Sequence, residues 1–306
     1  MKTMVFIAAL TLLASCSQNQ RNTTASSLVT SDEIYQEVQD IADQFFAHRP
    51  MQGFNHTMTL EQAYHWQDRF AEYVQPTMGP VIGYKTGGHD PGPGFPTFPP
   101  EGIRGLMLEG MMLPSGTAIT LDQTRRGFLE ADFAFRVGSV DINHAQSDME
   151  LLAGLDAIVP FAEIPDPYYE AGTRSINGTI VANMGSRMSF VGEPLMIEAT
   201  PAMMDKINTF TFAVHDENGV EVDTGTMATW YKPLDVVRWL RDHVHTSGKL
   251  LQPGQLLSLG NIGIIRQLHE KSPRGPAYQS NAFILSYYGL SDTPVSVTIN
   301  INRQQE

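Results

Sequence analysis

Cysteine is nearly absent from this chain of 306 residues, which holds only Cys16. The sequence therefore excludes an internal disulfide and a thiolate metal site. Basic residues are also scarce, with 20 lysines and arginines against 33 aspartates and glutamates and a formal net charge of −13. Because no basic block is available to neutralise phosphates, no nucleic-acid partner is expected, whereas the acidic surplus suits a protein that gathers cations.

Several familiar signatures are missing as well. The chain has no repeat at a fixed period and no low-complexity run. The loop rich in proline and glycine at residues 89–100 has neither the Walker spacing nor a dinucleotide fingerprint, so phosphate binding is unsupported. This loop is interpreted as a lid or rim, or simply as a long connection. What the chain does hold is 42% hydrophobic residues, enough to bury a large core.

The first residues are expected to be a leader and not part of the fold. Residues 4–13 form an apolar run after a short basic start, too short to span a bilayer as a permanent helix. Residues 13–16 then read Leu-Ala-Ser-Cys, which resembles the lipobox of bacterial lipoproteins and implies acylation of Cys16. Ser17 at the next position implies sorting to the outer membrane, facing the periplasm. A plain secretory signal with a chance cysteine is the alternative.

This interpretation gives a domain organisation in four parts. We expect a signal peptide at 1–15, a lipid-anchored flexible tether at 16–30, a helical region at 31–79 and one main domain at 80–306. The tether is polar and has no apolar periodicity, which is typical of a flexible segment. The lipid anchor is then the only expected contact with a membrane.

Two helices are predicted before residue 80. Ser31 is the expected N-cap of the first, which continues with apolar residues at helical spacing. Thr59, with Gln62 three residues on, predicts a capping box for the second helix, which should end before Pro76.

After residue 80 the pattern changes to strands and turns with few helices, which predicts an α+β fold with a mainly β, mixed-sheet body. We expect strands at 81–85, 127–138, 158–163, 175–183, 188–191, 210–214, 254–260, 282–288 and 295–301, hairpins at 110–116 and around 218–219, and helices at 149–157 and 234–244.

The strand at residues 127–138 carries the first chemical signal. Glu130 and Asp132 fall on one face of this strand, because side chains alternate with period two, and the other face is purely apolar. Two neighbouring carboxylates are costly to bury unless a cation lies between them or one is protonated. The pair indicates either a site for a hard metal ion or a solvated edge strand with two ordinary surface acids.

Three other residues are candidates for the same site. Glu163 ends an apolar run, where patterning alone does not explain an acid. Lys85 ends a short apolar strand, from which it could snorkel to water or serve as a partly desolvated base with a lowered pKa. His89 could activate a water molecule, although a lone histidine in a loop is more often a surface residue.

These residues carry a resemblance to the hydratase/decarboxylase branch of the fumarylacetoacetate hydrolase superfamily, typified by 2-keto-4-pentenoate hydratase. The similarity runs roughly from residue 59 to 301. It rests on an ordered set of short motifs: Gly83-Tyr84-Lys85, Glu130-x-Asp132, Pro160-Phe161-Ala162-Glu163-Ile164, Ala182-Asn183, Val237-x-Trp239-Leu240, Gly248 and the segment 254–260.

By this resemblance Glu130, Asp132 and Glu163 occupy the positions of the metal ligands. Lys85 occupies that of the active-site lysine, and Asn183 is a substrate-binding residue. Two positions depart from the family pattern: Asp132 stands where glutamate is usual, and alanine precedes Asn183 where aspartate is common. These departures bear on substrate identity and metal affinity more than on the fold.

The resemblance implies that residues 80–306 are the fumarylacetoacetate hydrolase-like catalytic domain of a metal-dependent lyase. This lyase would act on a small unsaturated 2-oxo acid, most simply by hydration. Three carboxylates suit Mg²⁺ or Mn²⁺, which would stabilise an enolate of the substrate while Lys85 orients the substrate or moves its proton. Decarboxylation and C–C bond hydrolysis use the same enolate. The alternative is a non-catalytic, tethered binding protein on the same fold. Relatives assemble into oligomers, so a homo-oligomer is expected by analogy.

Overall fold

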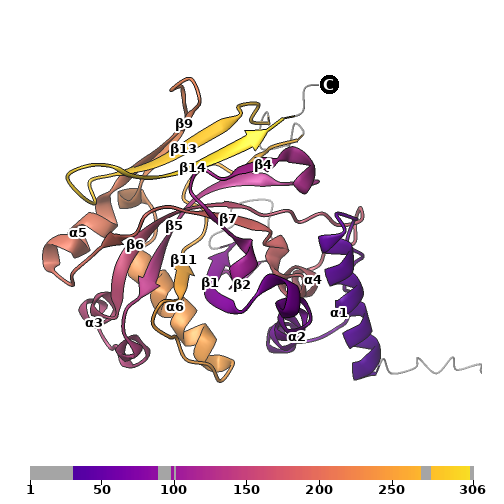
Figure 1. Ribbon diagram of the computed structural model, residues 1–306. Helices are drawn as coiled ribbons and strands as arrows, with labels where there is room; N and C mark the ends of the chain where they lie inside the picture. Colours follow the sequence, from indigo (N-terminus) through magenta and orange to yellow (C-terminus); the bar gives the residue numbers. More distant parts are fainter. Residues whose placement is uncertain (1–29, 89–97, 100, 270–276, 304–306) are drawn as a thin grey trace, which may run out of the picture.

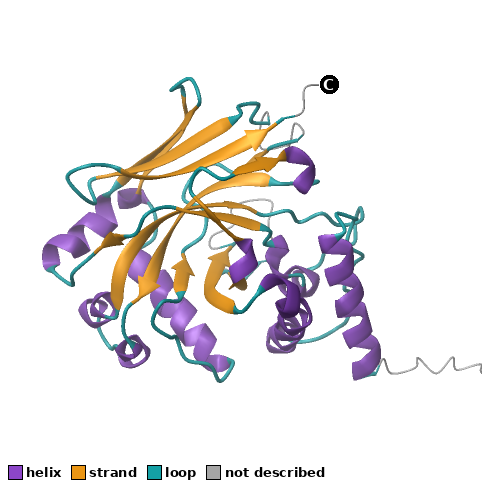
Figure 2. Cartoon of the chain, viewed as in Figure 1, coloured by secondary structure: helices purple, strands orange, loops and turns teal. Residues whose placement is uncertain are grey.

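The structure is a computed structural model that describes residues 30–88, 98–99, 101–269 and 277–303. It has the expected α+β fold, with two β-sheets packed on each other and helices around them (Figures 1 and 2). The helices are α1 (Ser31–Phe46), α2 (Leu60–Met78), α3 (Asp148–Ala153), α4 (Ile176–Val181), α5 (Pro201–Thr209) and α6 (Pro233–Thr246). None of the helices in the described part of the chain combines the length and the apolar content that a membrane crossing requires.

The larger sheet has nine strands and mixes parallel with antiparallel pairs. Its order is β2 (Ile103–Leu108), β1 (Val81–Gly87), β11 (Leu256–Ser258), β5 (Phe128–Val137), β6 (Leu155–Ile164), β7 (Met188–Val191) and β3 (Met112–Pro114), with β12 (Arg266–Gln267) beside β5 and β8 (Leu195–Met196) beside β6. The long central pair β5 and β6 therefore has other strands on both sides, with β11 beside β5 and β7 beside β6.

The smaller sheet has five strands. Its order is β10 (Glu221–Thr226), β9 (Thr211–Asp216), β13 (Ala282–Tyr288), β14 (Val295–Asn302) and β4 (Ala118–Thr120). Strands β9 and β10 pair as the hairpin predicted around 218–219. Strands β13 and β14 contact β6, so the two sheets lie face to face.

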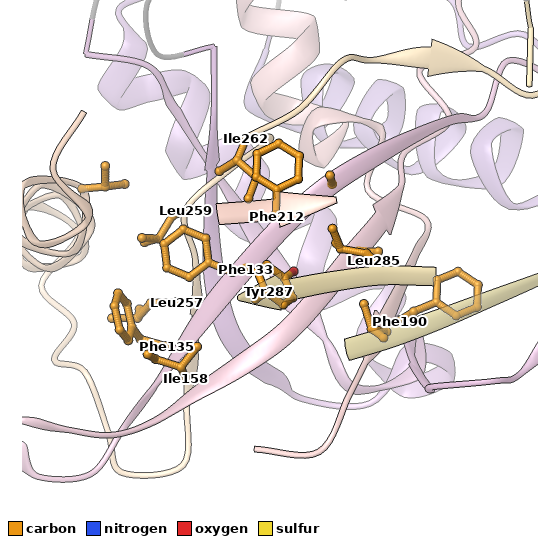
Figure 3. Close-up of a cluster of buried hydrophobic side chains, with 14 of the residues drawn as sticks. Phe133, Phe135, Ile158, Phe190, Phe212, Leu257, Leu259, Ile262, Leu285 and Tyr287 are labelled. Atoms are coloured by element: carbon orange, nitrogen blue, oxygen red, sulfur yellow. The ribbon is translucent and has the colours of Figure 1, made fainter. Parts of the chain in front are cut away.

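The main core fills the space between these sheets. The apolar face of β5 is buried as predicted: Phe133, Phe135 and Val137 are 0% exposed. Figure 3 shows Phe133 and Phe135 together with Tyr287, which reaches this core from β13. One face of β5 is thus used for packing, which leaves its opposite face for chemistry.

The helices form two groups, visible in Figure 1 as α1, α2 and α4 together and α3, α5 and α6 together. The first group has a core of its own, which includes Phe45 of α1, Phe70 of α2 and Ile180 of α4. Phe70 is 1% exposed. The helical N-terminal segment is packed onto the body through this second core.

Both predicted helix starts near the N-terminus use capping boxes, but the first begins one residue earlier than expected. Thr30, not Ser31, is the N-cap of α1, and its hydroxyl accepts a hydrogen bond from the backbone of Glu33. Glu33 lies three residues after Thr30, so only Thr30 has the partner that completes the box. The Thr59 cap of α2 is confirmed.

Helix α2 also runs past Pro76, contrary to prediction, and ends at Met78. The proline lies in the last turn, so only one hydrogen bond is lost before Gly79 ends the helix with a φ of 73°. Glycine adopts this left-handed conformation without the steric cost that a side chain would bring.

Three further predictions of local structure are wrong. Residues 110–116 do not form a hairpin, because the turn passes from one sheet to the other: Ser115 donates a backbone hydrogen bond to Val191, and Gly116 donates one to Thr298. Residues 175–183 contain helix α4, capped by the Ser175 hydroxyl, instead of a strand. The helix expected at 149–157 ends at residue 153, because residues from 155 onward pair as β6.

Candidate metal centre

Strand register brings the three predicted carboxylates to one face of the nine-stranded sheet. Glu130 of β5 lies directly opposite Glu163 of β6 in an antiparallel pair. Directly opposed side chains share a face, with Cβ atoms about 4.5–5.5 Å apart. Asp132 is two residues from Glu130 on the same strand and therefore points the same way. The three acids are neighbours because of sheet pairing, which sequence patterning could not show.

The same face receives Lys85 from β1. Lys85 pairs with Ser258 of β11, and Ser258 pairs in turn with Ala134 of β5. Ala134 is two residues from Asp132, so this row of the sheet places Lys85 and Ser258 beside the carboxylates. The lysine and the acids come together from strands that are far apart in the sequence.

Lys85 and Glu163 form a buried ion pair, in which Nζ of Lys85 donates to both carboxylate oxygens. Their exposed fractions are 3% and 1%. Burial by itself lowers the pKa of Lys85, but the negative charges of Glu163, Glu130 and Asp132 outweigh it and raise the pKa above its ordinary value. Both alternatives drawn from the sequence are therefore wrong, since Lys85 neither snorkels to water nor has a lowered pKa.

A glycine makes room for this lysine. Gly105 of β2 lies directly opposite Lys85. A Cβ atom at Gly105 would lie 2.8 Å from Cγ of Lys85, closer than side chains tolerate. Even alanine at this position would therefore displace the lysine side chain.

Asp132 is 0% exposed and is held by three groups. Its Oδ1 accepts a hydrogen bond from the backbone of Phe133 at 2.6 Å, and its Oδ2 accepts one from Oγ of Ser258 at 2.5 Å. The hydroxyl of Tyr287 donates to its backbone carbonyl. The surface-acid interpretation of this strand is wrong, because β5 is a central strand and Asp132 is inside the protein.

Burial raises the pKa of Asp132 from 3.8 to about 7, with a further contribution from the charge of Glu163 and against the hydrogen bond from Ser258. A carboxylate kept in such a place destabilises the protein at neutral pH. Strongly perturbed acids of this kind cluster at functional sites.

The donor set fits a hard divalent cation. Three carboxylates without thiolate or imidazole are the ligands that Mg²⁺ and Mn²⁺ prefer. In their present side-chain conformations, no three His, Cys, Asp or Glu residues of the described chain come close enough together to hold a metal ion. The carboxylate of Glu163 is bonded to Lys85 instead, so a cation would have to compete with the lysine for it.

The floor of this face is apolar. Beyond Asp132 the sheet carries a small buried cluster: Met107, Ala134, Val159, Phe161 and Leu256. Apolar surroundings strengthen the electrostatic interactions of the acids beside them, because they lower the local dielectric constant.

Asn183 is buried, and its side chain forms hydrogen bonds with the backbone of β2. Its amide accepts a hydrogen bond from the backbone nitrogen of Leu106 at 2.7 Å and donates one to the Leu106 carbonyl at 2.8 Å. It thereby fixes a turn in which Asn183 and Met184 have φ values of 50° and 60°. Met184 thereby lies close to Gly105, because a Cβ atom added to that glycine would be 3.1 Å from the Met184 sulfur. A role of Asn183 in substrate binding stays a prediction.

Two further candidates, His89 and Cys16, lie outside the described residues. Sequence reasoning missed Ser258 and Tyr287, which hold Asp132. Ser258 lies in the segment 254–260 that was identified as a strand, but a serine in an apolar strand gives no sign of its partner. Only the register of β11 against β5 reveals it.

Comparison with known proteins is informative at the level of structure alone. The sequence matches no protein-family model and no curated protein. Among solved structures, 4-oxalocrotonate decarboxylase from Pseudomonas putida G7, complexed with magnesium and adipate, matches with a TM-score of 0.71 at 17% identity over 90% of this chain and 99% of that chain. The same enzyme complexed with calcium and acetate gives a TM-score of 0.69 at 17% identity over the same shares of the two chains, 90% and 99%.

A fumarylacetoacetate hydrolase from Exiguobacterium antarcticum matches more weakly, with a TM-score of 0.46 at 12% identity over 75% of this chain and 77% of that chain. The expected fold class is confirmed. The chain has the fold of 4-oxalocrotonate decarboxylase.

Proposed function

We propose that this protein is a metal-dependent lyase acting on a small unsaturated 2-oxo acid, most simply by adding water to it as 2-keto-4-pentenoate hydratase does. One observation carries the proposal. Three carboxylates and a buried lysine lie on one face of the larger sheet, in a fold shared with an enzyme whose structure holds magnesium. One of the three acids, Asp132, is fully buried, and burying its charge costs free energy without improving the packing of the core.

Glu130, Asp132 and Glu163 would hold the cation. When bound, Mg²⁺ or Mn²⁺ would supply Lewis-acid polarisation of the substrate's 2-oxo group. The chain's own contribution to proton transfer is Lys85. Its raised pKa keeps Nζ protonated near neutral pH, so it can orient a substrate carboxylate or deliver a proton to carbon. The apolar floor formed by Phe161 and its neighbours limits the access of water to that proton.

Decarboxylation is the second candidate. Hydration and decarboxylation share an enolate of the 2-oxo acid. In hydration, water adds to the conjugated double bond, and the enolate that forms takes up a proton. In decarboxylation, the bond to a second carboxylate breaks, carbon dioxide leaves, and the electron pair of that bond forms the enolate, which then takes up a proton. The structural similarity to 4-oxalocrotonate decarboxylase favours this alternative. C–C bond hydrolysis is a further variant, for which no residue of the described chain argues specifically.

A non-catalytic binding protein is the third possibility, and the pairing of Glu163 with Lys85 favours it. If the ion pair were permanent, Glu163 would be unavailable to a cation and the site would be closed. The two classes differ in a measurable way, because only the enzyme needs the cation.

The test uses the chain from residue 22 onward with two substrates, 2-hydroxypenta-2,4-dienoate and 4-oxalocrotonate. Loss of ultraviolet absorbance reports the first reaction and release of carbon dioxide the second, each measured with Mg²⁺ and with a chelator. Glu130→Ala should abolish metal-dependent turnover, whereas Glu198→Ala, at an exposed acid outside the site, should leave it unchanged.

Turnover of either substrate that needs the cation and Glu130 would support the lyase and identify its reaction. Cation binding without turnover would mean that the substrate is different. The absence of both would favour the binding protein.

A further inference from the structure

In the described part of the structure, the Ser258 hydroxyl makes one hydrogen bond, and its partner is a candidate metal ligand. Its Oγ donates a hydrogen bond of 2.5 Å to Oδ2 of Asp132, and both residues are 0% exposed. Its sequence neighbours Leu257 and Leu259 point to the opposite face of the sheet, where they are apolar core residues. In the described structure, the hydrogen bond to Asp132 is therefore the interaction that accounts for a hydroxyl at this position.

The hydrogen bonds to Asp132 fix the plane of its carboxylate. Oδ1 accepts from the backbone of Phe133 and Oδ2 accepts from Ser258, so each oxygen has one donor. A carboxylate oxygen has two lone pairs, and each oxygen thus keeps one for a cation. The backbone donor is present whatever the side chains are, whereas the donor to Oδ2 depends on residue 258 alone.

The position of Ser258 in the sheet adds a second argument. In the row that crosses β1, β11 and β5, it stands between Lys85 and the strand that carries Asp132. Lys85 lies on the same face of the sheet, and its positive charge acts on Asp132. Without the hydroxyl, Oδ2 would be a buried acceptor with no partner, and the carboxylate would gain by turning toward the lysine.

We propose that Ser258 is a positioning residue for the metal centre, which holds Asp132 in the orientation that a cation needs and keeps it from pairing with Lys85. This inference rests on the proposed function. It also accounts for the short side chain at position 132, because a hydroxyl fixed beside an aspartate supplies the orientation that a longer and more mobile acid would lack. Partners of this kind, which contact a ligand and not the metal, typically change metal affinity about 10- to 100-fold when removed.

The test measures the binding of Mn²⁺ alone by calorimetry, together with the thermal midpoint of each metal-free variant. Ser258→Ala should weaken Mn²⁺ binding about 10- to 100-fold, and Ser258→Thr, which keeps the hydroxyl, should restore most of it. Ser186→Ala is the matched control. Ser186 is also a buried serine, but its Oγ has no hydrogen-bond partner in the described structure, so its loss should leave the affinity unchanged.

The outcomes separate this inference from the proposed function. No Mn²⁺ binding by the unsubstituted protein would overturn the proposed function and the inference with it. Binding that is unchanged in a folded Ser258→Ala variant would overturn the inference alone. Equal losses in the Ser258 and Ser186 alanine variants would also overturn it, since they would indicate a general effect of packing.

Discussion

Asparagine in place of Asp132 should make the metal-free protein more stable and unable to bind its cation. The side chain is fully buried, and burial raises its pKa from 3.8 to about 7. Above that pKa the folded protein holds a desolvated negative charge, which the amide removes at nearly the same volume. The amide keeps both hydrogen bonds, because its oxygen can accept from Phe133 while its nitrogen donates to Ser258.

The sign and size of the effect follow from linkage. Asp132 binds its proton more tightly in the folded state than in the unfolded state, so its contribution to stability falls as the pH rises from 3.8 to about 7. Each unit of difference in pKa corresponds to about 1.4 kcal/mol. The stabilisation by Asp132→Asn should therefore be about 1.6 kcal/mol at pH 5 and about 4 kcal/mol at pH 8. The larger value corresponds to roughly 8 °C in the thermal midpoint for a protein of this size.

The assay compares thermal unfolding of the two proteins in a chelator at several pH values between 5 and 8, and then with Mn²⁺. The gap in midpoint should widen as the pH rises. Mn²⁺ should raise the midpoint of the wild-type protein and leave that of Asp132→Asn unchanged. A variant that is less stable at pH 8, or one that binds Mn²⁺ as well as the wild type does, would refute the reasoning that Asp132 is kept buried for a cation.

Two further predictions concern Lys85 and Cys16. Lys85→Met leaves Glu163 buried without its cation and should destabilise the metal-free protein by about 3–5 kcal/mol, measured by urea unfolding in a chelator, with Mn²⁺ recovering part of the loss. Lys249→Met is the control, since that lysine pairs with Asp68 at 2.7 Å in a half-exposed position and should contribute no more than about 1 kcal/mol. Cys16→Ala should release the protein from the membrane fraction of a bacterium that processes lipoproteins, as followed by fractionation and labelling with palmitate.

The predictions for Lys85 and Cys16 can each be contradicted by a specific result. Equal effects of the Lys85 and Lys249 substitutions would mean that the buried pair contributes no more than a surface one. A Cys16→Ala protein that stays with the membrane would rule out the acyl anchor as its means of attachment.

The sequence predicted those features that depend on neighbours along the chain. The alternation in β5 placed Phe133 in the core and Asp132 on the other face, and the Thr59 cap and the turn at 218–219 were found where expected. Each of these is set by a period or by a short turn motif, which local residues determine. The hairpin predicted at 110–116 failed because this segment is placed by the distant strands that it joins.

The same distinction between local and long-range features applies to the candidate site. The sequence by itself determined the composition of the site, because three acids and a lysine in or next to apolar strands could be seen without a structure. Only the tertiary structure decided that Lys85 is paired with Glu163 and has a raised pKa. It alone brought Ser258 to Asp132. The physical reason is that electrostatic and hydrogen-bond partners across a sheet are chosen by strand order and register, which pair residues far apart in the chain.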